Sequence, residues 1–314
     1  MGIDVLGKGM DVFSFWDKNM NESPLVVKMA DHSWRKYAAA TGSKYHKISE
    51  ENIESYEALL DSDSQSTLIN FRLNFQDLEP HWSWVHYTDC LRLALLEKFG
   101  GIWVDGTVCA MPELHKRLPS WKGLLLPSHV GSNNMEMESW FILCRTPDPM
   151  LQNWSHRFMD YCKDLQLRSQ ILGSPKRFSI DLLLREATKY HPALTKIWFS
   201  KMVKSYFRVA PYFAIYYMFS MVLRESELGG AFQYHLPFDS AGWTIFNRSE
   251  WLDPIPDNLE NRILDLPFIK LCYKSNRGVT DVESIPEGCM LDDIFSQIDA
   301  DWRKVMREQY GPHT

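Results

Sequence analysis

The segment over residues 87–107, YTDCLRLALLEKFGGIWVDGT, constrains the fold of this chain more than any other. Apolar residues at helical spacing stop at a Gly-Gly pair, and a short apolar run over 102–104 then leads to Asp105. Glycine is the usual residue where a helix ends, and a short apolar run after it is typical of a buried strand. The segment therefore predicts a helix, a tight turn and a buried strand that ends in an acid.

The lengths of these elements predict where their ends lie. A helix of about 12 residues is roughly 18 Å long, and a strand of about four residues returns roughly 13 Å. The helix start and the strand end then lie at the same edge of a sheet, which is where open α/β folds bind ligands. Asp89 and Arg92 are placed at the helix start and on one helix face. We therefore expect Asp89, Arg92 and Asp105 to converge on one ligand.

The rest of the chain alternates between strand-like and helix-like patterns. Such alternation predicts βα units around a mostly parallel sheet flanked by helices. The polar stretch over 61–66 reads as a loop. We expect one α/β domain over residues 1–314, with a helical insertion in its C-terminal half. The expected strands are 12–16, 45–48, 123–127, 140–144 and a late strand near 266–274, and the expected helices are 24–37, an acidic helix after Ser49, 148–163, 179–190 and 203–224.

Composition excludes several classes of protein. The net charge is −6 and no long basic run occurs, which argues against a nucleic-acid partner. No apolar stretch of about 18 residues and no signal-peptide pattern is seen, so nothing is expected to span a membrane. The cysteines form no C-x-x-C pair, so zinc is not expected and a reducing, cytoplasmic location fits. These cysteines are Cys90, Cys109, Cys144, Cys162, Cys272 and Cys289.

The segment 87–107 resembles the S-D-x-x-R…G-G-x-x-x-D signature of the capsular polysaccharide synthesis glycosyltransferases. These are relatives of glycosyltransferase family 32 and of the clostridial glucosylating toxins. Further stretches are similar to the same enzymes: FSFWD at 13–17, Ser33-Trp34, SWFI at 139–142 and KLCYK at 270–274.

The resemblance implies a Rossmann-like fold of the GT-A type and a hexosyltransferase. The donor would be a nucleotide-diphospho-sugar, a UDP-sugar by analogy, and the acceptor a glycan of a capsule or surface polysaccharide, lipid-linked acceptors included. The family link implies retention of anomeric configuration. It also divides the chain into a nucleotide-sugar-binding core (1–145), a helical acceptor-side region (146–235) and a C-terminal closing segment (236–314).

The resemblance assigns roles to the acids and the arginine of the motif. Asp89 and Arg92 would hold hydroxyl groups of the donor sugar, and Asp105 would organise the ribose and the diphosphate. A guanidinium beside a carboxylate is well suited to orient hydroxyl groups. The competing interpretation makes Asp89 a helix cap, Arg92 a surface residue and Asp105-Gly106 an ordinary turn.

Aromatic and basic residues complete the expected donor site. Trp16 would pack against the nucleotide base, with Phe13 beside it, although both are also typical core residues. Lys274, preferred over Lys270, would stabilise the leaving diphosphate from the C-terminal segment. Two lysines on an exposed strand are the alternative.

A divalent metal is the common partner of such a diphosphate. Many relatives have D-x-D here, but this chain has Thr107 in the position of the second acid. Asp105 and Thr107 would bind Mn²⁺ or Mg²⁺ weakly, and a lysine near the diphosphate could take over part of the metal's role. His235 is a further candidate ligand, although a lone histidine is usually structural.

Two further features stay open. Glu136 and Glu138 could provide a base for an inverting reaction, but we favour solvated loop acids. No carboxylate stands out as a nucleophile, so a route in which the leaving phosphate deprotonates the acceptor fits better. The aromatic and basic residues of 203–224 could rest on a membrane surface, but a buried helix kinked at Pro211 is favoured.

Two other functions compete with the transferase. A glycoside hydrolase would use two facing carboxylates, a role that Asp89 and Asp105 could fill. A non-catalytic protein that binds nucleotide sugars is suggested by the missing second acid.

Overall fold

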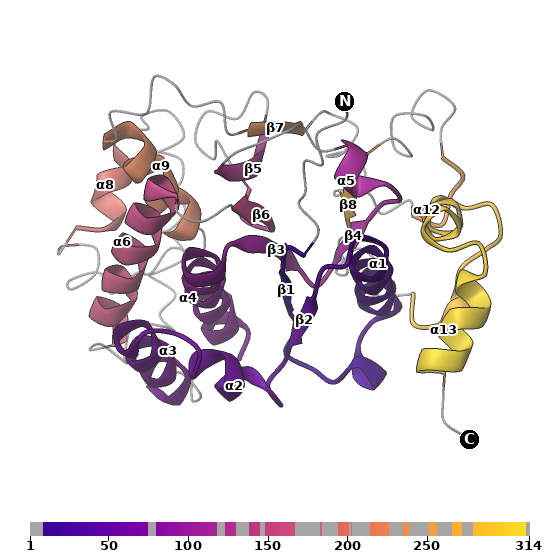
Figure 1. The fold of residues 1–314 in the computed structure, drawn as a ribbon, viewed down its shortest axis with the longest axis horizontal. Helices are drawn as coiled ribbons and strands as arrows, with labels where there is room; N and C mark the ends of the chain where they lie inside the picture. The colour runs from indigo at the N-terminus through magenta and orange to yellow at the C-terminus, as the bar shows by residue number, and fades with distance from the viewer. Residues whose placement is uncertain are drawn as a thin grey trace. The chain divides into compact units, whose positions relative to one another are not determined.

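The computed structural model divides the chain into two compact units (Figure 1). The first unit combines residues 1–52, 101–122 and 238–314, and the second combines residues 53–100 and 123–237. Within them the structure describes residues 9–74, 80–117, 123–129, 138–144, 148–166, 183, 194–200, 202, 214–225, 235–238, 251–255, 266–271 and 279–311.

Three parallel strands form the centre of the first unit. β1 (Val12–Phe15) lies between β2 (Tyr45–Ile48) and β3 (Gly101–Asp105), and both pairings are parallel. All four residues of β1 are buried, as expected for a parallel strand covered on both faces. The register sets Phe15 opposite Asp105, so the carboxyl ends of β1 and β3 lie at one edge. The predicted strands over 12–16, 45–48 and 102–104 are confirmed.

Helix α1 (Leu25–Thr41) holds the second strand pair of this unit. β4 (Val108–Ala110) pairs antiparallel with β8 (Phe268–Lys270), the predicted late strand. The indole of Trp34 donates to the carbonyl of Val108 at 2.7 Å, and the hydroxyl of Ser33 accepts from the backbone of Ala110 at 2.9 Å. Ser33-Trp34, one of the stretches that carry the family resemblance, therefore anchors β4.

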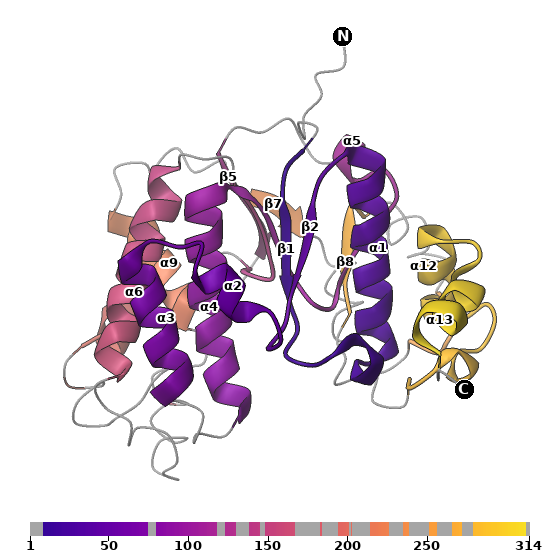
Figure 2. The same cartoon turned by 60° about the horizontal axis from the view of Figure 1, so that its bottom comes forward.

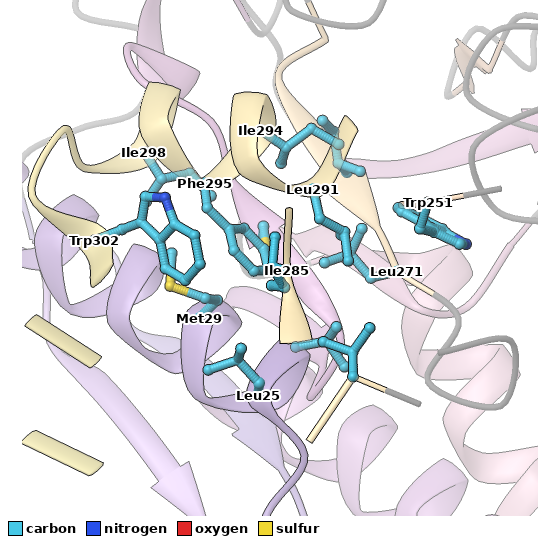
Figure 3. Close-up of a cluster of buried hydrophobic side chains, with 14 of the residues drawn as sticks. Leu25, Met29, Trp251, Leu271, Ile285, Leu291, Ile294, Phe295, Ile298 and Trp302 are labelled. Carbon is cyan, nitrogen blue, oxygen red and sulfur yellow. The ribbon is translucent and has the colours of Figure 1, made fainter. Parts of the chain in front are cut away.

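The C-terminal residues supply most of the core on the other side of α1 (Figure 3). Figure 2 shows α1 between the strands β1 and β2 and the helices α12 (Met290–Ile298) and α13 (Trp302–Tyr310). Phe295 and Trp302 pack edge to face, with ring centroids 5.1 Å apart. The hydroxyl of Tyr310 donates to Asp31 of α1 at 2.9 Å, which ties the end of α13 to the same helix. Short elements of this unit are η1 (Met20–Glu22), α5 (Leu114–Arg117) and η5 (Val282–Ser284).

The second unit is mainly helical. β5 (Leu124–His129) pairs antiparallel with β6 (Phe141–Cys144), and β7 (His235–Phe238) lies next to β5. Its helices are α2 (Ile53–Glu57), α3 (Ser62–Asn74), α4 (Pro80–Phe99), α6 (Pro149–Gln166), α8 (Thr195–Trp198) and α9 (Ala214–Glu225). Helix α6 packs against α3, α4 and α9.

Three sequence predictions in this unit are wrong. The stretch 61–66 is not a loop, because the carboxylate of Asp61 accepts from the backbone of Asp63 and Ser64 and so caps α3. The motif helix begins at Pro80, a residue that suits the first turn of a helix, and Asp89 lies in its middle. The interpretation of Asp89 as a helix cap is therefore wrong as well.

The α/β class and the parallel strands flanked by helices are confirmed. Strands predicted at 123–127 and 140–144 correspond to β5 and β6, and the helix predicted at 148–163 corresponds to α6. The acidic helix expected after Ser49 is reduced to the short α2. The helix predicted at 179–190 falls almost entirely outside the described residues, and the division into regions 1–145, 146–235 and 236–314 stays a prediction.

Candidate functional site

Asp105 ends β3 and pairs with a lysine from the C-terminal part of the chain. The ammonium nitrogen of Lys270 lies 2.6 Å from Oδ2 of Asp105, and the two side chains are 14% and 29% exposed. The indole of Trp103 donates to Oδ1 at 3.4 Å. Trp103 and Asp105 lie on one face of β3 because residues two apart on a strand share a face. The carboxylate is thus half-buried, oriented and ion-paired.

Strand pairing brings Lys270 to this place. In the β4–β8 ladder Lys270 is opposite Val108, and the backbone of Leu271 donates to the carbonyl of Thr107 at 2.9 Å. Lys270 therefore lies beside the turn that follows Asp105. Lys274 lies outside the described part of the chain, so its contact with the diphosphate stays a prediction.

Trp16 packs against the turn after Asp105. A Cβ atom at Gly106 would lie 2.9 Å from Cε3 of Trp16 and 3.0 Å from the carbonyl oxygen of Phe15. Only glycine allows so close an approach of the indole to this backbone. Phe13, by contrast, is 2% exposed and stacks on His46 with ring centroids 4.9 Å apart. Phe13 is thus a core residue in this structure, while Trp16 is only half-buried.

The donors around Asp105 do not favour a divalent metal. Its carboxylate already faces an ammonium group, and Thr107 is buried. Among the residues that the structure describes, no group of three or more His, Cys, Asp or Glu side chains could hold a metal ion. Mn²⁺ or Mg²⁺ at Asp105 and Thr107 stays a prediction.

Asp89 and Arg92 form a buried pair in the second unit. Nη2 of Arg92 lies 3.1 Å from Oδ1 of Asp89, with the two side chains 7% and 4% exposed. Nη1 of Arg92 donates to the carbonyl of Ser139 at 2.6 Å and contacts its hydroxyl at 2.9 Å. The interpretation of Arg92 as a surface residue is therefore wrong. A buried guanidinium held on both sides is a rigid, oriented donor group.

Glu138 belongs to the same unit and is not a solvated loop acid. It is 8% exposed, and the hydroxyl of Tyr216 on α9 donates to its Oε2 at 3.2 Å. The backbone of Glu138 donates to the carbonyl of Pro127 on β5 at 2.8 Å. Glu138 is thus a buried acid directly before Ser139. The sequence alone carried no signal for this, because Tyr216 lies 78 positions away.

Three other expected features are only partly described. Glu136 and the side chain of His235 lie outside the described residues. Helix α9 covers the last part of the predicted 203–224 helix, and its residues Tyr217, Phe219 and Val222 are buried. The core interpretation is confirmed for this part. No helix among the described residues is both long and apolar enough to cross a membrane.

The described cysteines are free, buried thiols. Burial raises the pKa of Cys109 and of Cys144 to about 12. Such thiols are inert and behave as small apolar residues. They support the core rather than the chemistry.

Comparison with known proteins assigns the family. The sequence profile of the capsular polysaccharide synthesis protein family matches residues 6–206, more than half of the chain, and the chain belongs to this family. No curated protein is significantly similar to it. Among solved structures, the chain is similar to the UDP-bound glycosyltransferase domain from the YGT toxin. That likeness has a TM-score of 0.37 at 9% identity and covers 89% of this chain and 75% of that chain.

Proposed function

We propose that this protein is a GT-A-type glycosyltransferase that moves a hexose from a nucleotide-diphospho-sugar to a glycan acceptor in capsule or surface polysaccharide synthesis. The observation that carries the proposal is membership of the capsular polysaccharide synthesis family over residues 6–206. That match includes Asp89, Arg92 and Asp105. UDP-sugar is the donor that we propose, and lipid-linked glycans are among the acceptors.

Each candidate residue has a proposed role that suits its surroundings within its own unit. Asp105, at the carboxyl end of a parallel strand, would organise the ribose and diphosphate, and Trp16 beside it would pack on the base. Asp89 and Arg92, buried and hydrogen-bonded, would hold sugar hydroxyls. A role for Lys274 at the diphosphate stays a prediction, because this residue lies outside the described part of the chain.

The transfer would retain the anomeric configuration through a front-face route. The bond between C1 of the sugar and the β-phosphate oxygen breaks, and its electron pair leaves with the nucleoside diphosphate. The acceptor oxygen bonds to C1 from the same side and passes its proton to the leaving phosphate. This route needs no protein nucleophile.

Release of nucleoside diphosphate from a panel of nucleotide sugars tests the proposal. The native chain should consume one donor slowly in water and faster with an acceptor, and Asp105→Ala should lose at least about 100-fold in rate. Asp160→Ala is the control, because Asp160 is 77% exposed on α6 and should behave as native.

Two results would contradict the proposal. Cleavage of glycans with no nucleotide sugar present would favour a hydrolase. Tight binding of UDP without turnover of any donor, with or without acceptor, would favour a non-catalytic binding protein.

A further inference from the structure

The Asp105–Lys270 pair lies at the carboxyl end of β3, the edge where open α/β folds bind ligands. A departing diphosphate gains negative charge as its bond to the sugar breaks, and the environment must neutralise that charge. The D-x-D acids of metal-dependent relatives would recruit a divalent ion here. This chain has one acid, one buried threonine and a lysine within 2.6 Å of the acid.

We propose that the ammonium group of Lys270, held by Asp105, stabilises the leaving diphosphate, so that donor turnover needs no divalent metal. This inference rests on the proposed function. It assigns to Lys270 the contact with the β-phosphate, and to Asp105 the placing of that ammonium group.

The backbone around Lys270 is fixed at both ends of its strand. Val108 lies opposite it in the ladder, Leu271 donates to Thr107 at 2.9 Å, and Met111 donates to Pro267 at 3.1 Å. Such a ladder fixes the backbone of Lys270, and with it the Cα atom from which the side chain extends, before substrate binds. Preorganised charge of this kind stabilises a transition state without reorganisation during the reaction.

The chemistry of the pair also suits the task. An ammonium group has three N–H donors, so a contact with Asp105 is compatible with a second contact to a phosphate oxygen. Lys270 is 14% exposed and Asp105 is 29% exposed, so the pair is shielded but reachable by a ligand. A divalent cation bound to Asp105 would stand next to a like charge, which opposes its binding.

The transfer of the sugar needs no metal to account for its bonds, electrons and proton. The C1–oxygen bond to the β-phosphate breaks and its electrons stay on the phosphate oxygen. A new bond forms between the acceptor oxygen and C1, and the acceptor proton moves to the phosphate. Lys270 keeps its proton throughout and contributes only its charge and a hydrogen bond.

Turnover in the presence of EDTA tests this proposal. The native chain should release nucleoside diphosphate at the same rate in EDTA and in Mn²⁺ or Mg²⁺. Lys270→Met should lower kcat by about 100-fold in EDTA, and Lys270→Arg should restore part of it. Lys116→Met is the matched control, since Lys116 is a lysine of the same unit with a 62% exposed side chain, and it should behave as native.

A binding measurement separates this role from a merely structural ion pair. In EDTA the native chain should bind UDP more tightly than UMP, and Lys270→Met should reduce that preference about tenfold. A structural pair would lower the melting temperature of Lys270→Met without changing the preference for diphosphate.

Three results decide the matter. Loss of native turnover in EDTA with recovery in Mn²⁺ would overturn the inference and leave the transferase intact. Unchanged kcat and unchanged UDP preference in Lys270→Met would also overturn it. If the native chain turns over no donor under any metal condition, the proposed function fails, and the inference fails with it.

Discussion

Nη1 of Arg92 lies 2.6 Å from the carbonyl oxygen of Ser139, while Nη2 of the same guanidinium lies 3.1 Å from Asp89. One planar group thus links the middle of α4 to the residues just before β6. A lysine has one nitrogen on a flexible stem and cannot make both contacts in this geometry.

Arg92→Lys should therefore reduce both activity and stability. We expect turnover of the donor to fall by about 100-fold, and the free energy of unfolding to fall by about 1–3 kcal/mol because a buried acceptor loses its partner. Urea unfolding and donor hydrolysis measure the two effects. Arg157→Lys on α6 is the control, because its pair with Glu225 is 38% and 31% exposed and should contribute little. Native-like turnover in Arg92→Lys would show that Arg92 has no role in donor binding or transfer.

Gly106→Ala should weaken nucleotide binding through Trp16. The added Cβ would lie 2.9 Å from Cε3 of the indole, which must then move. We expect Gly106→Ala to raise the Kd for UDP about tenfold in the native background, as measured by titration calorimetry. In the Trp16→Ala background the same substitution should raise the Kd by a smaller factor. Equal effects of Gly106→Ala in both backgrounds would show that Trp16 does not carry the effect.

Gly101→Ala should be far more damaging than Gly42→Ala. Both glycines have positive φ, at +99° and +70°, so both substitutions cost about 1–2 kcal/mol of backbone strain. At Gly101 the new Cβ would also lie 2.3 Å from the carbonyl of Asp11, whereas nothing lies within 4 Å at Gly42. We expect Gly101→Ala to cost at least about 3 kcal/mol in urea unfolding, because β3 must shift away from β1. Similar costs at the two positions would contradict the close approach of Gly101 to Asp11.

Asp299→Asn should reduce the decrease in the free energy of unfolding at acid pH. Burial raises the pKa of Asp299, but hydrogen bonds from His32 and Lys36 outweigh it and lower the pKa from 3.8 to about 2. Between these two values the unfolded chain binds a proton that the folded chain does not, so stability falls as the pH falls through this window. Above the pKa of the unfolded chain, the ionised carboxylate contributes its full share to the free energy of unfolding, about 1 kcal/mol after solvent screening.

Urea unfolding at pH 7 and at steps down toward pH 2 measures this effect. The native chain should lose more stability than Asp299→Asn over that range. Asp301→Asn, at an exposed neighbouring carboxylate, should follow the native curve. Parallel curves for the native chain and Asp299→Asn would show that the contacts with His32 and Lys36 do not matter in solution.

Local patterns were sufficient for the parallel strands of the first unit and for the end of the motif helix, but not for the start of that helix. The alternation of apolar runs predicted β1, β2, β3 and α1, and the Gly-Gly pair located the boundary between α4 and β3. These features depend on backbone conformation and on apolar periodicity within a few residues, which any sequence displays directly. The same reasoning identified Asp89, Arg92 and Asp105 as candidates.

Contacts between distant residues were beyond such patterns. Lys270 reaches Asp105 across 165 positions because β8 pairs with β4, and nothing in KLCYK distinguishes Lys270 from Lys274. The sequence around Glu138 predicts a solvated loop acid, whereas in the structure Glu138 is buried and hydrogen-bonded to Tyr216 of α9. The sequence by itself determined the α/β elements and the family motif, since both are local. Only the tertiary structure decided which charges meet and which are buried, because strand pairing and packing bring together residues that no local spacing relates.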